Sequence, residues 1–148
     1  MSLDVGALLL QTVPFARGLG ITYDFAAEGR AVCRLPDRED LHNHVGGPHA
    51  GALFTLAESA SGAAMLSALG DQLTRAVPLA TTANVEYRKL AMGEVRAEAR
   101  LLVSREEVVA ALDAGERPVF DAVVDVTNGD GVVVAAMTVT WTLRPNRT

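Results

Sequence analysis

The chain has 148 residues, of which 49% are hydrophobic and 21% are charged, and its formal net charge at pH 7 is −5. A chain of this length fits a single domain over residues 1–148 and can bury about two-thirds of its unfolded surface. The negative charge, with no basic stripe to neutralise phosphates, excludes a typical nucleic-acid-binding protein. Cys33 is the only cysteine, so no intramolecular disulfide can form, and we expect a cytoplasmic protein. The apolar run at residues 8–10 is too short to cross a membrane, so we expect no membrane association.

The N-terminal segment predicts one helix followed by two strands. Residues 1–17 favour a helix with Ser2 as its N-cap, and Pro14 is expected to end or kink it. Residues 21–25 and 30–35 are typical of short strands on either side of a turn.

The next predicted element, a helix over residues 52–69, is apolar almost all round yet contains Glu58. A helix without a polar face is normally buried. A carboxylate inside such a helix is costly unless something pairs with it, which makes Glu58 the first candidate for chemistry.

After Pro78 the hydrophobic pattern takes the period of a strand, and four strands are expected in sequence. They cover residues 83–90, 95–103, 120–126 and 132–143, with a hairpin turn at residues 128–131. A capping box that begins at Ser104 opens a short helix between the second and third of them, closed by Gly115 and Pro118. One long buried helix against an antiparallel sheet is an α+β fold.

The position of Glu58 on its helix predicts a homodimer. Gly51 and Thr55 lie on nearly the same face, and the seven residues from Gly51 to Glu58 rise about 10 Å. The free N–H groups at the helix start could polarise a carbonyl, but Glu58 is too far along the same helix to attack its carbon. A second helix running antiparallel alongside would close this gap, giving two sites at a subunit interface. The alternative is a structural Glu58, paired with an arginine or capped by Thr55 or Ser61.

The loop before this helix carries further polar candidates. His49 stands at the helix start, where a neutral imidazole could donate a hydrogen bond to a ligand or hold the loop. Asn43 could cap the helix or bind a substrate carbonyl. His42, His44 and His49 lie within eight residues, but no second ligand cluster accompanies them, so we expect no metal site.

This region resembles the signature of hotdog-fold acyl-CoA thioesterases of the phenylacetate-pathway type. That signature is Asn-x-x-Gly-x-x-His-Gly-Gly, an apolar stretch, and Asp or Glu nine residues after the His. It is matched here by Asn43, Gly46, His49, Gly51 and Glu58. Residues 14–21 and 84–91 are similar to the family's opening segment and to its next strand.

The resemblance implies an antiparallel sheet of five or six strands wrapped around the central helix, dimerisation through the sheet, and thioester hydrolysis between subunits. By position, Glu58 would be the general base or nucleophile. His49 and Asn43 would position the thioester, and the backbone N–H of Ala50 or Gly51 would polarise its carbonyl.

Three features depart from the family pattern: Ala50 replaces a glycine, Glu58 replaces the commoner aspartate, and the helical insert at residues 104–118 is longer than the usual hairpin. Two other functions therefore stay open. One is a non-catalytic protein that binds acyl-CoA or an acyl carrier, and the other is a hotdog hydratase or dehydratase.

The expected substrate is an apolar or aryl acyl thioester, with coenzyme A as part of the substrate and no further cofactor. Arg88 and Lys89 could meet the phosphates of coenzyme A, although a solvated strand end explains them equally well. Four hydroxyl-bearing residues are candidates to line the substrate groove: Thr55, Ser61, Thr81 and Thr82. The acyl group, the carrier, and the pairing of dimers into tetramers are left open.

Overall fold

The structure, a computed structural model, describes residues 3–147. Its helices are α1 (Val5–Thr12), α2 (Pro14–Gly18), α3 (Ala50–Leu69) and α4 (Arg105–Asp113), with 3-10 turns at Glu39–Leu41 and Gly70–Thr74. Its strands are β1 (Thr22–Ala27), β2 (Arg30–Leu35), β3 (Ala76–Tyr87), β4 (Val95–Leu101), β5 (Val119–Thr127) and β6 (Val133–Pro145).

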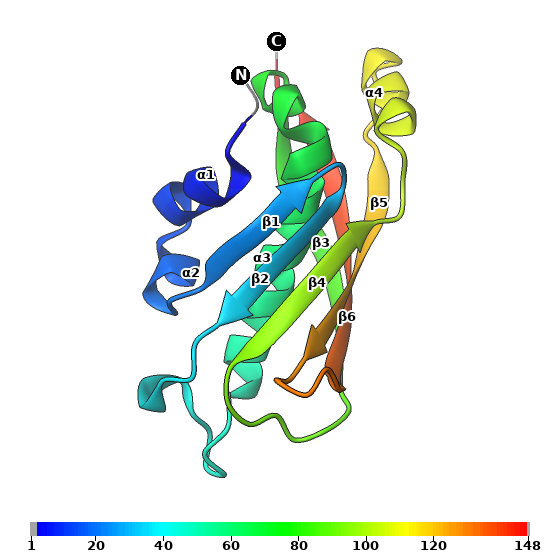
Figure 1. Ribbon diagram of the computed structural model, residues 1–148. Helices are drawn as coiled ribbons and strands as arrows, with labels where there is room; N and C mark the ends of the chain where they lie inside the picture. The colour runs from blue at the N-terminus through cyan, green and yellow to red at the C-terminus, as the bar shows by residue number, and fades with distance from the viewer. Residues whose placement is uncertain (1–2, 148) are drawn as a thin grey trace.

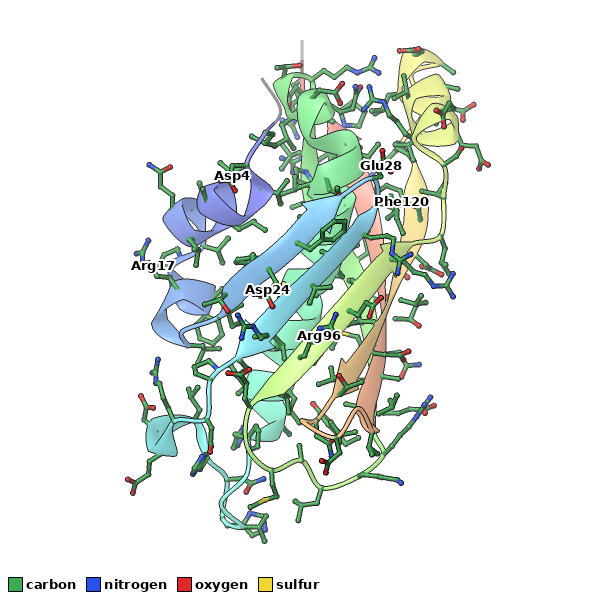
Figure 2. All side chains as sticks on the ribbon, in the orientation of Figure 1. Asp4, Arg17, Asp24, Glu28, Arg96 and Phe120 are labelled. Atoms are coloured by element: carbon green, nitrogen blue, oxygen red, sulfur yellow. The ribbon has the colours of Figure 1, made fainter. Side chains whose placement is uncertain are left out.

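The six strands form one antiparallel sheet in the order β1-β2-β4-β5-β6-β3, and the sheet curls around α3 (Figure 1). Side chains alternate between its two faces, and the inner face packs its apolar residues on the helix. The outer face carries charged side chains, such as Asp24 on β1 and Arg96 on β4 (Figure 2). The expected α+β arrangement is confirmed.

The central helix is the core of the molecule. Every residue from 59 to 66 is buried, and α3 packs against five of the six strands and against α1. By composition the segment Ala50–Thr74 is long and apolar enough to cross a membrane, but 72% of its most apolar stretch is buried inside the protein. The N-terminal half differs, since a face containing Gly51, Thr55 and Glu58 stays partly exposed. That open face is where a site can form.

Two expectations at the ends of elements are corrected. The first helix begins after Asp4, whose carboxylate accepts the Ala7 N–H at 3.0 Å; Ser2 lies outside the described residues. The strand expected at residues 83–90 starts earlier, at Ala76, and runs through Pro78. Proline is tolerated there because β3 is an edge strand, with one side free of ladder partners.

Candidate functional site

His49 caps the N-terminus of α3 with its own side chain. Its Nδ1 accepts the Gly51 N–H at 2.8 Å, and its backbone N–H donates to the Leu41 carbonyl at 2.8 Å. Because Nδ1 is the acceptor, a neutral His49 ring carries its proton on Nε2. This fixed tautomer leaves Nε2–H as a hydrogen-bond donor for a ligand.

Two backbone N–H groups were candidates to polarise a carbonyl, and the structure separates them. The Gly51 N–H is already engaged by His49. Within residues 3–147 the N–H of Ala50 has no hydrogen-bond acceptor, as is usual in the first turn of a helix. Ala50 is exposed, so its N–H is the available donor at this end of α3.

Asn43 holds the loop that leads into α3. Its Oδ1 accepts the N–H groups of Val45 at 2.9 Å and Gly47 at 3.2 Å, and its Nδ2 donates to the Pro48 carbonyl at 3.4 Å. Its backbone N–H also bonds to the Gly47 carbonyl at 2.7 Å. Asn43 therefore shapes the approach to the helix end, and of its side-chain atoms Nδ2 keeps one hydrogen for a ligand.

Glu58 is half-buried on the open face of α3, and its carboxylate has no ion pair or hydrogen bond within the described chain. Burial raises its pKa above the ordinary value of 4.5. The pairings expected for a structural glutamate are not found: the Thr55 hydroxyl donates to the Gly51 carbonyl at 2.9 Å, and the Ser61 hydroxyl donates to the backbone carbonyl of Glu58 at 2.7 Å. A partly desolvated carboxylate without a partner is available as a base.

One subunit does not bring Glu58 and His49 together. Glu58 comes nine positions after His49, a rise of about 13 Å along the helix. Within one subunit the two side chains could therefore contact only separate parts of a long substrate, and acting together on one small group would require two subunits.

Ser61, expected to line the substrate groove, lies instead in the core. It is fully buried, and besides donating to Glu58 its Oγ accepts the Trp141 indole N–H at 3.1 Å. Its place is between α3 and β6, in the core.

Thr81 and Thr82 lie at a bulge in the middle of β3, where the register with β6 shifts between Ala80 and Thr82. Thr82 pairs with Thr140, so after the bulge it shares the outer face of the sheet with Glu86, away from α3. Thr82 therefore does not line the helix-side groove. The Thr81 hydroxyl donates to the Thr140 carbonyl at 3.1 Å, within its own sheet.

Two recesses flank the start of α3. One is apolar, with a volume of about 310 Å³, and its walls include Phe15, Leu19, Leu41, His49 and Ala52. The other, of about 300 Å³, lies under the end of β3, and its walls include Asn43, Ala50, Tyr87, Arg88 and Lys89. The structure thus gathers the loop asparagine, the free helix N–H and both predicted cations around one recess.

The two cations of the second recess differ in whether they form a salt bridge. Arg88 donates to Glu86 at 3.1 Å, in a pair that is exposed to solvent on both sides. Lys89 has no salt bridge among the described residues. No group of three or more His, Cys, Asp or Glu side chains within residues 3–147 is arranged to hold a metal ion, and His42 is instead bonded to Asp37 at 2.6 Å.

Tyr87 was not among the site residues expected from the sequence. Its hydroxyl donates to the Ala50 carbonyl at 3.1 Å, joining the end of β3 to the first turn of α3. Tyr87 lies in the segment similar to the family's next strand, so an aromatic residue at that strand end was the available signal.

Strand β3 leaves an unpaired edge. Its 12 residues pair with β6 on one side only, and residues 80–84 are all exposed, including those directed toward α3. A long edge with free N–H and C=O groups is a template for pairing with another strand.

Comparison with solved structures finds the same fold over nearly the whole chain. A Pseudomonas aeruginosa protein of unknown function, described as a probable thioesterase, has a TM-score of 0.86 and 27% sequence identity and covers 99% of each chain. A conserved protein, also from Pseudomonas aeruginosa, has a TM-score of 0.71 and 27% identity over 87% of this chain and 92% of that one. The PaaI protein from the phenylacetic acid degradation operon of E. coli shares the fold alone, with a TM-score of 0.73 and 19% identity over 96% and 91% of the two chains.

The chain therefore has the hotdog fold expected from the sequence. Comparison with curated proteins finds no match. A family model described as a domain of unknown function, DUF4442, matches residues 4–143. Since that match spans nearly all of the chain, the protein is a member of the DUF4442 family.

Proposed function

We propose that this protein is an acyl-CoA thioesterase that works as a homodimer with two sites at its interface. The observation that carries the proposal is the half-buried carboxylate of Glu58, which has no partner within the described chain. It lies on the same helix as an N-terminus where the Ala50 N–H is free and His49 offers its Nε2–H as a donor. The likeness to a Pseudomonas aeruginosa protein described as a probable thioesterase supports it.

The dimer would form through the edge of β3. Pairing of Ala76–Tyr87 with its own copy in a full-length antiparallel register places the two-fold axis between Thr81 and Thr82. Because α3 lies along the sheet, the same rotation makes the two α3 helices antiparallel (Figure 1). Glu58 of each subunit then faces the α3 N-terminus of the other, which overcomes the separation of about 13 Å within one chain.

In each site, the Ala50 N–H and His49 Nε2–H would donate to the thioester carbonyl oxygen. One well-placed donor of this kind stabilises a developing oxyanion by roughly 3 kcal/mol. Glu58 of the opposite subunit would either take a proton from the attacking water or attack the carbonyl carbon itself. The carbon–sulfur bond then breaks, and the coenzyme A thiolate leaves and takes up a proton, which in the first route comes from Glu58. In the second route the acyl group is left on Glu58 as a mixed anhydride, which water then hydrolyses to release the acid and restore the carboxylate.

The two recesses suggest how the substrate lies. The apolar recess at Phe15 would take the acyl group, and the recess at Arg88 and Lys89 would take the phosphate-bearing part of coenzyme A. The cations there are solvated, so we expect them to raise affinity modestly and in a salt-dependent way.

The first test measures the release of thiol from short, medium, long and aryl acyl-CoAs, with a disulfide reagent to detect the thiol. We expect the protein to turn over at least one class, and Glu58→Ala to lose that turnover while staying folded and dimeric. Turnover retained by Glu58→Ala would refute the role of Glu58. Tight acyl-CoA binding with no thiol release from any class would favour a non-catalytic binder, and hydration of crotonyl-CoA would favour a hydratase.

A second test asks whether each site uses two subunits. Dimers that carry one Glu58→Ala chain and one His49→Ala chain, isolated with two different tags, contain one intact site if the site is shared. We expect such heterodimers to recover about half of the wild-type rate, while both homodimers stay inactive. Heterodimers as inactive as the homodimers would show that Glu58 and His49 act from the same chain.

A further inference from the structure

Tyr87 reaches the first turn of α3 from a firmly held strand end. The backbone N–H groups of Arg88 and Lys89 both donate to the Val134 carbonyl, at 2.8 and 3.1 Å, and Tyr87 itself pairs with Ala135 of β6. From this base the Tyr87 hydroxyl donates to the Ala50 carbonyl at 3.1 Å. The sheet therefore holds one peptide group of the helix start through a single side chain.

The peptide group that Tyr87 holds is the one that sets the state of His49. The Ala50 carbonyl and the Gly51 N–H belong to the same peptide, and that N–H donates to His49 Nδ1 at 2.8 Å. Hydrogen bonds in such a chain polarise one another, so a donor on the carbonyl oxygen strengthens the donation by the N–H. These two hydrogen bonds point in one direction, from the Tyr87 hydroxyl through the Ala50–Gly51 peptide to the His49 imidazole.

We propose that Tyr87 is a positioning residue that acts through the Ala50–Gly51 peptide to keep His49 in the tautomer with its proton on Nε2. In this role Tyr87 touches no reacting atom. It fixes the orientation of the first turn of α3, and with it the direction of both donors to the substrate, Ala50 N–H and His49 Nε2–H. Its catalytic part rests on the proposed thioesterase function, but its effect on His49 does not.

The test is Tyr87→Phe, which removes only the hydroxyl from a half-exposed ring and so leaves the packing of β3 intact. The matched control is Thr138→Val, which deletes a hydroxyl from the outer face of the same sheet. The Thr138 hydroxyl donates no hydrogen bond within the described chain. We expect kcat to fall about three- to tenfold in Tyr87→Phe, the range for loss of one neutral hydrogen bond, with KM changed less than about twofold. Thr138→Val should behave as the wild type.

A second readout is independent of turnover. In protein labelled with ¹⁵N-histidine, the ring nitrogens of His49 report which of them carries the proton. Wild type should show the Nε2–H tautomer alone, and Tyr87→Phe should show a mixture of both tautomers. An unchanged tautomer, or an unchanged kcat beside an altered tautomer, would overturn the proposal. If the wild type hydrolyses no thioester, the proposed function fails, and the tautomer measurement alone decides the role of Tyr87.

Discussion

Replacement of Ser61 by Ala should cost stability and leave catalysis intact. Ser61 is fully buried, donates to the Glu58 carbonyl at 2.7 Å and accepts the indole N–H of Trp141 at 3.1 Å. In Ser61→Ala the Glu58 carbonyl keeps its helical bond, but the Trp141 N–H loses its partner in the core. A buried unsatisfied donor costs about 1–3 kcal/mol, and alanine returns about 0.5 kcal/mol through its higher helix propensity.

The net loss is therefore about 0.5–2.5 kcal/mol in the free energy of unfolding. For a chain of this length that corresponds to a fall in Tm of roughly 2–8 °C. Calorimetry or circular dichroism on Ser61→Ala measures this fall, and thiol release under the same conditions should give a KM within about twofold of the wild type. In a Trp141→Phe background no indole N–H remains to be orphaned, so the same Ser61→Ala change should cost markedly less.

Two results would refute this reasoning. Equal costs of Ser61→Ala in both backgrounds would show that the bond to Trp141 contributes nothing. A large rise in KM without loss of stability would indicate that Ser61 binds the substrate.

Three further predictions concern charge and close packing. Because burial raises the pKa of Glu58, the folded state binds more protons at this group than the unfolded state does, and the group destabilises the protein as pH rises through and above 4.5. Glu58→Gln should therefore raise Tm at pH 7 but not at pH 4. Thermal scans at both pH values test this. The Arg105 guanidinium lowers the pKa of Asp71 to about 2, so this ion pair stabilises the folded protein above pH 3.8 and ceases to do so as pH falls toward 2. Asp71→Asn should therefore lower Tm slightly at pH 7 and not at pH 2. A difference in Tm that persists at pH 2 would contradict this. A Cβ at Gly47 would clash with the Ala91 carbonyl oxygen. Gly47→Ala should therefore cost about 1–3 kcal/mol in urea unfolding and lower turnover, whereas an unchanged midpoint would disprove that contact.

The sequence was sufficient to predict the central helix and most of the sheet. An apolar run of helical length that contains Glu58 is stable only when buried, and the structure buries most of it. The period-two pattern of β4 likewise survives in the alternation of buried and exposed residues along that strand. Both signals are local, so they can be read from neighbours in the chain.

The errors arose where distant segments decide the outcome. Ser61 was expected to line the groove, but its partner Trp141, which places it in the core, lies 80 residues away in the chain. The bulge at Ala80 and Thr82 shifts the alternation within β3, so the face occupied by Thr82 cannot be counted from the strand's apolar residues. Tyr87 was missed for the same reason, since its acceptor at Ala50 is 37 residues earlier.

The open edge of β3 also has a consequence for how the protein must be handled. A lone subunit exposes the free backbone groups of a 12-residue strand whose first charged side chain is Glu86. Such an edge recruits any extended chain, including unfolded copies of the same protein, and so nucleates aggregation. Dilution that dissociates a dimer paired through β3 would therefore be followed by irreversible loss of protein, and a single lysine placed at residue 82 would give a soluble monomer instead.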